Sequence, residues 1–328
     1  MATKRTHLNR IGVAILVAAA ALAAAPHALA YGWPVKPFDK PHPVRANFGD
    51  PRTTFRGPPT LRTLLSAGGV FAFHFGVDIA APDGTAVYAV RDGVVSLKSG
   101  TTVHVDSAGD FATEYWHIRP VVRDGQHVDA YRTILGYITK GHEHVHFTEL
   151  DGHQPVNPLV AGHLDPYDDA TRPTVNGISF RWNDTGRDVP AEFLRGRVVM
   201  VADASDTPAL PVPGLWGALP VAPALVTWHV ERAKDGKVVL AERTAFDVRR
   251  TIPPNDAFWR YYARGTRQNM ANFGTHRFWR SPGVYLYKLT PRPFDTHRLP
   301  NGIYRLVVTA ADTAGNRASL AQVITVLN

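Results

Sequence analysis

Histidine and aspartate side chains recur in the first half of the sequence at spacings that can bind a metal ion. They lie in three separate segments, His74-x-x-x-Asp78, Tyr115-Trp116-His117 and His144-Val145-His146. Zinc binds neutral imidazole nitrogen and carboxylate oxygen, and a catalytic zinc site leaves one coordination position open for water. Two histidines and one aspartate would leave a site with a net charge of about +1, which is still a strong Lewis acid. The sequence therefore predicts a metallohydrolase with catalytic imidazoles beside the metal.

The third segment is predicted to be a β-strand that presents both of its histidines to one side. Side chains alternate along a strand, so His144 and His146 share one face while Val145 and Phe147 lie on the other. The two apolar side chains can anchor the strand in a core while the imidazoles face a cleft. Further strands, separated by turns that contain glycine, are predicted upstream within residues 85–95, 101–105 and 113–116.

The length of 328 residues predicts two domains after processing, because a single hydrophobic core rarely grows beyond about 250–300 residues. An acidic, turn-rich stretch without periodicity, residues 165–173, has the character of a linker. From residue 174 onward, short strands alternate with turn signals such as Asp235-Gly236, a pattern typical of a β-sandwich. With 27 glycines, 26 prolines and no long helical run in the mature part, the chain is predicted to be mostly β.

The first 30 residues have the layout of a secretory signal peptide. A basic start, residues 4–10, is followed by an apolar run, residues 11–25, and by the cleavage pattern Ala28-Leu29-Ala30. The apolar run is shorter than the roughly 20 residues of a membrane-spanning helix, and Pro26 ends it. We therefore expect cleavage before Tyr31, secretion of the mature protein, and no later segment that spans a membrane.

Composition excludes several classes of protein. The chain contains no cysteine, which rules out disulfide bonds and a lipid anchor on a cysteine at the cleavage site. The formal charge is +8, and loss of three basic residues with the signal would leave 8 − 3 = +5. That mild excess favours an anionic surface or polymer as the partner. Because there is no block of Lys and Arg, and because the protein is expected to be secreted, nucleic-acid binding is not expected.

Several motifs of the first half resemble, in their order and identity, the lysostaphin/LytM-type peptidoglycan endopeptidases of family M23. The motifs are His74-Phe75-Gly76-Val77-Asp78, Asp92-Gly93-Val94-Val95, Tyr115-Trp116-His117, Gly125-Gln126-His127-Val128 and His144-Val145-His146-Phe147. The resemblance covers roughly residues 45 to 160. It is specific because several motifs occur together in the family's order. The end of the chain, from Asn301 to Asn316, resembles bacterial immunoglobulin-like or fibronectin-like modules.

The resemblance to family M23 implies roles for five side chains. His74, Asp78 and His146 would be the ligands of one zinc ion per chain, and His144 and His117 the catalytic imidazoles. Zinc lowers the pKa of bound water to around 7, so hydroxide is available at neutral pH. A histidine beside the metal can take the proton and return it to the leaving amine. The second free histidine can help the metal to stabilise the oxyanion.

Other residues near these motifs are candidates for supporting roles. His142 can share the strand face of the paired histidines, but the family pattern places Phe directly after the ligand and so selects His146. Thr148 stands where the family usually has a carboxylate that supports the ligands, so that support is not expected here. His104 and His127 are expected to be solvated strand and turn residues.

Four further residues are candidates for contacts with the substrate, namely Arg45, Arg52, Tyr115 and Asn157. Arg45 and Arg52 flank Phe48-Gly49 and could bind the acidic parts of a peptide stem. A charged surface loop explains the two arginines equally well.

A later segment, residues 258–279, is rich in aromatic and arginine side chains and contains no acidic residue. Aromatic faces stack on sugar rings and arginine pairs with anions, so a wall-docking loop is one interpretation. Ordinary sandwich core followed by an irregular insertion is the other. A short helix is also predicted at residues 61–65, within an insertion between Arg52 and His74.

Together these observations predict a LytM-type antiparallel β-sheet peptidase domain, residues 31–165, followed by an immunoglobulin-like β-sandwich, residues 166–328, after a signal peptide at residues 1–30. The predicted reaction is zinc-dependent hydrolysis of amide bonds in the peptide stems or cross-links of peptidoglycan, in the periplasm or at the external cell wall. One alternative is a non-catalytic scaffold that binds the wall or activates amidases. Another is a zinc peptidase that acts on exported proteins.

Overall fold

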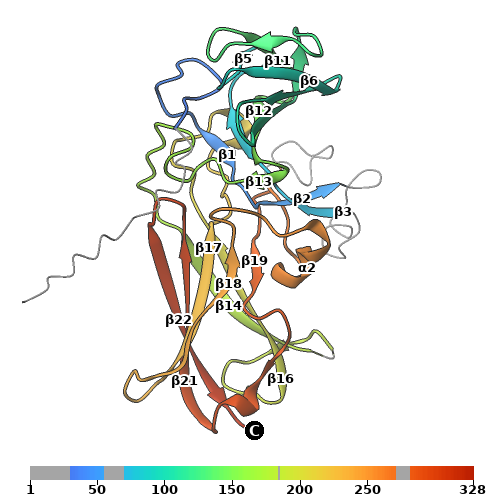
Figure 1. The fold of residues 1–328 in the computed structure, drawn as a ribbon. Coiled ribbons are helices and arrows are strands. Elements are labelled where there is room, and N and C mark those ends of the chain that lie inside the picture. The colour runs from blue at the N-terminus through green and yellow to red at the C-terminus, as the bar shows by residue number, and fades with distance from the viewer. Residues whose placement is uncertain (1–29, 55–69, 184, 271–280) are drawn as a thin grey trace, which may run out of the picture.

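The structure is a computed structural model that describes residues 30–54, 70–183, 185–270 and 281–328. Apart from a short helix, α2 (Phe258–Tyr261), and a few 3₁₀ turns, its regular elements are β-strands, so the predicted mostly β class is confirmed. The strands form two units stacked end to end (Figure 1). No helix among the described residues is long and apolar enough to cross a membrane.

The first unit is built on an eight-stranded antiparallel sheet. Its order is β1 (Val44–Ala46), β4 (Val77–Ala80), β12 (His144–Asp151), β8 (Phe111–Trp116), β7 (Thr102–Asp106), β6 (Gly93–Ser99) and β10 (His127–Val128), with β13 (Gln154–Val156) paired to β12. Two small antiparallel sheets complete the unit, one of β5 (Ala86–Tyr88), β11 (Ile134–Ile138) and β9 (Ile118–Pro120), the other of β2 (Pro51–Thr54) and β3 (Val70–Phe73). The antiparallel sheet predicted for this part is therefore confirmed.

Strand β12 lies inside the large sheet, between β4 and β8. Its side chains alternate, and Val145 and Phe147 are fully buried in the core. His146 is in register with Asp78 of β4 on one side and with Trp116 of β8 on the other. This pairing brings residues from three distant parts of the sequence to one place.

The second unit consists of two antiparallel sheets. The first has the order β15 (Asp188–Val189), β14 (Thr174–Trp182), β16 (Arg197–Ser205) and β19 (Leu286–Lys288), with β20 (Phe294–Asp295) paired to β16; the second has the order β18 (Val238–Asp247), β17 (Leu225–Arg232), β21 (Gly302–Ala311) and β22 (Arg317–Val326). The sheets share one core, in which the Trp228 ring lies 6.2 Å from the Phe294 ring of the opposite sheet. A specifically immunoglobulin-like arrangement of these strands stays a prediction.

An aromatic cluster joins the two units. Phe73 of β3 packs against Phe258 and Tyr262, with ring centroids 5.3 and 5.8 Å away. Phe258 and Tyr262 are almost completely buried, so this part of the aromatic segment is core. The rest of that segment from residue 271 onward, and the helix predicted at residues 61–65, lie outside the described residues.

Hydrogen bonds tie the chain before β2 to the second unit. Ala222 N donates to Asp50 Oδ1 at 2.8 Å, and Asn47 Nδ2 donates to the Ala222 carbonyl at 3.1 Å. Gly49 lies between them with a φ of 85°, and a Cβ at this position would lie 2.7 Å from Val248 Cγ2. Glycine is therefore required both by the left-handed backbone and by the close approach of the second unit.

Three carboxylates, those of Asp169, Asp206 and Asp312, lie close together, with oxygen atoms within 4.8 Å of one another. Asp206 and Asp312 are buried. Burial, reinforced by the charges of its two acidic neighbours, raises the pKa of Asp206 to about 8 although Thr207 N donates to its carboxylate. The fold therefore holds a proton on Asp206 far more tightly than the unfolded chain does.

We predict that Asp206→Asn stabilises the protein in alkaline solution. The folded-state pKa is raised, so the stability that the bound proton contributes is complete below the unfolded pKa of about 3.9 and is lost as the pH rises through about 8. Asparagine keeps an oxygen for the Thr207 N–H, which lies 2.8 Å from Asp206 Oδ1, and carries no charge. The substitution should raise the free energy of unfolding by about 1–2 kcal/mol near pH 9 and by little near pH 4.

Thermal unfolding at the two pH values, in buffer that contains a chelator, measures this effect. Asp256→Asn, which removes an exposed carboxylate, is the matched control and should change neither value. A gain of equal size at both pH values would contradict the assignment.

Candidate metal centre

Three donor atoms from different segments converge at the centre of the first unit. His74, between β3 and β4, places Nε2 2.7 Å from Nδ1 of His146 on β12. Both nitrogens lie 3.1 Å from Oδ1 of Asp78 on β4. In a tetrahedral zinc site with bonds of about 2.0–2.2 Å, the ligand atoms are about 3.3 Å apart, so one ion can bind all three.

The other nitrogen of each imidazole has a partner that sets its tautomer. His74 Nδ1 donates to the carbonyl oxygen of Asn47 at 2.8 Å, which leaves Nε2 with a free electron pair. His146 Nε2 lies 3.0 Å from the Thr148 hydroxyl. Thr148, where no supporting contact was expected, therefore touches one of the three donor residues. Glu149 points to the opposite side, where it accepts from Tyr31 and His163.

The protonation states of this group suit a divalent cation. Burial, with the nearby positive charge of Arg52, lowers the pKa of His74 to about 3. Burial alone would raise the pKa of Asp78, but His144, His74 and Arg52 together hold it well below its usual range. At neutral pH His74 is therefore a neutral imidazole and Asp78 an ionised carboxylate, which are the forms that bind zinc. The residues present fit a zinc ion.

Two arginines contact the same aspartate. Arg52 Nη2 lies 3.1 Å from Asp78 Oδ2, and Arg45 Nε lies 4.0 Å from the same oxygen. Arg45 is only 8% exposed, and its guanidinium carbon lies 3.8 Å from the ring centre of Trp216, a residue of the second unit. Arg45 Nε and Nη1 have no hydrogen-bond partner. Arg45 is therefore a buried cation beside the donor group, and the interpretation of both arginines as parts of a charged surface loop is wrong.

The two predicted catalytic imidazoles lie beside the donor group. His144 Nδ1 donates to the carbonyl oxygen of His142 at 2.6 Å, which leaves Nε2 unprotonated and 3.5 Å from Asp78 Oδ1. The His117 ring lies 4.7 Å from the His144 ring and 6.3 Å from the His146 ring. Burial lowers the pKa of His144 to about 3 and that of His117 to about 4. Both imidazoles are therefore neutral at pH 7, as a general base must be.

His142 belongs to the rim of this site and does not join the three donors. Its ring stacks on His117 with a centroid distance of 4.4 Å, and its Nδ1 lies 2.9 Å from the Thr139 hydroxyl. Thr139 in turn donates, through its amide and its hydroxyl, to the carbonyl oxygen of His117. These bonds hold His117 in a left-handed backbone conformation with a φ of 65°.

Two of the predicted substrate contacts lie in the protein interior. Tyr115 is fully buried, and its hydroxyl accepts from Val90 N at 3.0 Å and from the Thr113 hydroxyl. Asn157 is buried and donates to the Val248 carbonyl of the second unit at 3.1 Å. Both side chains are engaged in holding the fold, so the structure does not support their proposed role.

The structure also corrects the environment of one histidine and shows contacts that the motifs did not indicate. His104 is buried between Asp106 and Glu114, so the expectation that it is solvated is wrong, whereas His127 is exposed. The contacts of Asn47 with His74 and of Trp216 with Arg45 carry no signal in the sequence. The contact of Trp216 with Arg45 depends on how the second unit packs against the first.

Comparison with known proteins gives a family for part of the chain. Residues 72–158 match the model of Peptidase family M23. Over 97 residues the chain is 33% identical to a peptidoglycan DD-endopeptidase, ShyC, of Vibrio cholerae serotype O1. The aligned part is 26% of this chain and 22% of that protein, so the chain spans about a fifth of the curated relative's length.

Solved structures of similar proteins match the chain over about two fifths of its length. They include the catalytic domain of a prophage-encoded M23 protein, EnpA, from Enterococcus faecalis, with 26% identity, coverage of 38% of this chain and 95% of that chain, and a TM-score of 0.28. A zinc-containing peptidase from Vibrio cholerae has 23% identity, coverage of 36% and 39%, and a TM-score of 0.25. The family match and the sequence identity together show that residues 72–158 of this chain form a peptidase family M23 domain.

Proposed function

We propose that this chain is a zinc-dependent endopeptidase that hydrolyses amide bonds in the peptide stems or cross-links of peptidoglycan. The observation that carries the proposal is the convergence of His74, Asp78 and His146 within 3.1 Å of one another, beside two neutral imidazoles. The family match supports a peptidase, and a relative that is named a DD-endopeptidase supports cross-links as the substrate.

The residues around the donor group suit hydrolysis of an amide. Zinc held by His74, Asp78 and His146 would supply a Lewis acid that makes hydroxide available near neutral pH. His144 Nε2, kept unprotonated by the bond from Nδ1 to the His142 carbonyl, accepts the proton of the attacking water and returns it to the leaving amine. His117, held beside His144, can donate its N–H to the oxygen that becomes negative during attack.

The remaining predictions are proposed together with this function. Residues 1–30 would be removed as a signal peptide, and the mature protein would act in the periplasm or at the external wall. Residues 31–165 would form the peptidase domain, and residues 166–328 an immunoglobulin-like domain.

Substitution of His144 tests whether metal binding and catalysis depend on different residues. Purified mature protein should contain about one zinc per chain, and His144→Ala should keep the metal while the rate of cleavage falls by about 10²–10⁴. His146→Ala should lose both the metal and the activity. Metal analysis together with turnover of cross-linked muropeptides measures the two effects. His127→Ala, which removes an exposed histidine of β10, is the control. Loss of zinc from the His144 variant would overturn the assignment of roles.

Digestion of isolated sacculi identifies the substrate. The parent protein should release soluble muropeptides whose masses show new amine and carboxylate ends at stem or cross-link amides, and a chelator should stop the release. If the sacculi stay intact while exported proteins are cleaved, the result would favour a zinc peptidase that acts on exported proteins. A lack of turnover on every substrate by zinc-loaded protein would favour the non-catalytic scaffold.

The buried guanidinium of Arg45 is proposed to bind a substrate carboxylate close to the scissile bond. Two of its nitrogens lack a partner, and hydrogen bonds between charged groups contribute about 1.5–3 kcal/mol. We expect Arg45→Gln to lower kcat/KM about tenfold for a stem peptide with a free carboxylate, and to change it little for the corresponding primary amide. Zinc content should stay at the parental level, and Arg123→Gln in an exposed turn serves as the control. An equal loss for both peptides would show that Arg45 serves only to hold Asp78.

A further inference from the structure

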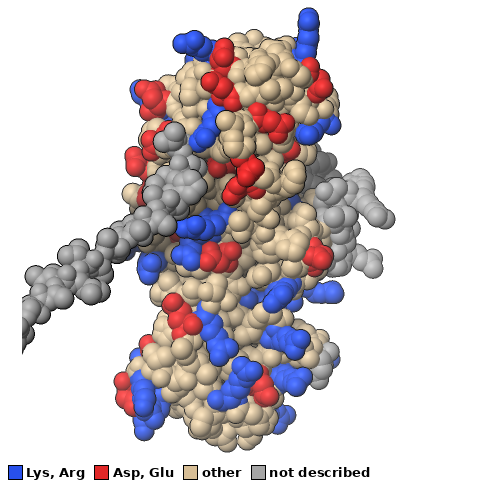
Figure 2. All heavy atoms as spheres, in the orientation of Figure 1, with Lys and Arg blue, Asp and Glu red and all other residues tan. Residues whose placement is uncertain are grey.

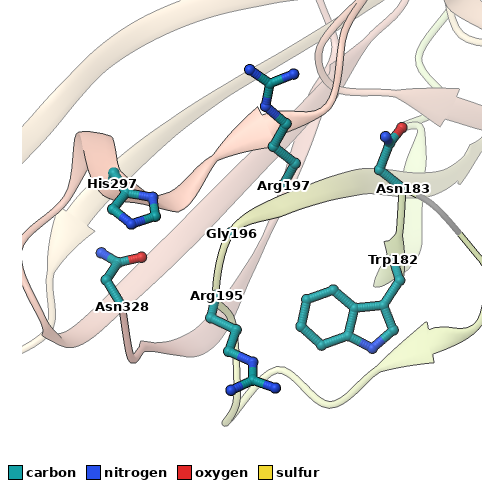
Figure 3. A pocket seen from close by; sticks show the side chains of 7 residues that line it. All are labelled: Trp182, Asn183, Arg195, Gly196, Arg197, His297 and Asn328. Atoms are coloured by element: carbon teal, nitrogen blue, oxygen red, sulfur yellow. The ribbon is translucent and has the colours of Figure 1, made fainter.

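A hollow lies in the second unit, far from the donor group. It has a volume of about 460 Å³, opens to solvent, and is lined by Trp182, Asn183, Arg195, Gly196, Arg197, His297 and Asn328. The chain's C-terminal end, which contributes Asn328, lies at the opposite end of the molecule from β12 (Figure 1). Figure 3 shows His297 and Asn328 on one side of Gly196 and Trp182 and Asn183 on the other, with the side chains of Arg195 and Arg197 extending in opposite directions. The hollow falls within the size range of small-ligand sites, about 300–1,000 Å³.

The floor of this hollow is fixed by hydrogen bonds. The amide of Asn328 donates to the carbonyl oxygens of Thr296 and Leu299 and accepts from the Thr296 hydroxyl. Thr296 N donates to the Gly196 carbonyl at 2.9 Å, and Leu194 N donates to Thr325 O at 2.9 Å. The end of the chain, the turn before β16 and the short segment after β20 therefore form one connected surface, which needs little reordering to bind a ligand.

The charged side chains around this floor are positive and available. Arg195 and Arg197 are both exposed. Arg197 lies opposite Asp295 in the pairing of β16 with β20, and the hydrogen bonds from His297 together with the charge of Arg197 lower the pKa of that carboxyl. Arg195 lies 5.2 Å from the ring centre of the exposed Phe193. His297 Nδ1 is bonded to Asp295 at 2.9 Å, which leaves its Nε2 for another partner. Two guanidinium groups and an imidazole thus line the hollow, and the nearby carboxylate of Asp295 offsets part of their positive charge.

Trp182 adds an aromatic surface to these cations. Its side chain is half-buried at the end of β14, and it lies across the hollow from His297 (Figure 3). Indole faces stack on the apolar faces of sugar rings, and arginine binds carboxylate or phosphate through several N–H groups. An aromatic platform beside two exposed guanidinium groups is the combination that a charged sugar needs.

The second part of the chain, which contains the hollow, also carries most of the net positive charge. Residues 166–328 contain 21 Lys and Arg against 14 Asp and Glu, which gives 21 − 14 = +7, whereas residues 31–165 contain 12 against 14, which gives −2. Figure 2 shows Lys and Arg gathered on the lower part of the molecule, where the second unit lies. A positive surface raises the local concentration of an anionic polymer before it binds.

We propose that this hollow binds a saccharide that carries a carboxylate or a phosphate group. The sugar ring lies against Trp182, and its anionic group contacts Arg195 or Arg197. The site lies apart from the donor group and would keep the chain on an anionic glycan while the first unit acts elsewhere.

Calorimetric titration of the complete mature protein tests the site with three probes. They are N-acetylglucosaminyl-N-acetylmuramic acid, which carries a carboxylate, N-acetylglucosamine 1-phosphate, which carries a phosphate, and neutral di-N-acetylchitobiose. At least one anionic probe should bind about tenfold more tightly than the neutral one, and its identity distinguishes a carboxylate-bearing glycan from a phosphate-bearing polymer. Added salt should weaken that binding.

Two variants connect the binding to the named residues. The double variant Arg195→Gln/Arg197→Gln should bind the anionic probe about tenfold more weakly, so that the anionic probe no longer binds more tightly than the neutral sugar. Trp182→Ala should lower the affinity for both kinds of sugar. Arg123→Gln/Arg317→Gln removes two exposed arginines elsewhere and so matches the change in net charge. It should bind like the parent, and unfolding temperatures confirm that every variant is folded. Equal binding of all probes, no binding of any, or the same loss in the control variant would overturn the proposal.

Discussion

The burial of the Asp78 carboxylate is the interaction on which the first unit depends. An ionised carboxylate removed from water is costly unless cations and hydrogen-bond donors surround it. Here Arg52 lies 3.1 Å and Arg45 4.0 Å from one oxygen, while the donor nitrogens of His74 and His146 lie 3.1 Å from the other, where a bound cation would neutralise the charge. Each partner comes from a different segment, so the charge is compensated only after the strands have assembled. The sheet and the donor group therefore form together.

The second unit takes part in this arrangement although it supplies none of the three donor atoms. The carbonyl of Asn47 orients His74, and the side chain of Asn47 is itself bonded to Ala222. On the other side, Trp216 packs on the guanidinium of Arg45, which lies 3.4 Å from His144 Nε2. A change in the packing between the units would therefore shift the positions of the His74 and His144 imidazoles. The two units are best understood as one cooperative structure.

Local patterns in the sequence were sufficient for the class of the fold. The alternation around Val145 and Phe147 placed a strand where β12 lies, because a period of two needs only neighbouring residues to be recognised. His74, Asp78 and His146 were chosen on the resemblance to family M23, and the structure brings their donor atoms within 3.1 Å of one another. The predicted strands at residues 101–105 and 113–116 lie within one or two residues of β7 and β8.

Contacts between distant segments were not predictable in this way. Tyr115 and Asn157 stand in motifs next to the site, yet one is buried in the core and the other holds the second unit. Trp216 reaches Arg45 across 171 positions of the chain. The motif pattern reports the type and spacing of residues along the backbone. The direction of a side chain and its partners follow from strand register and from the packing of the two units, which are properties of the whole chain.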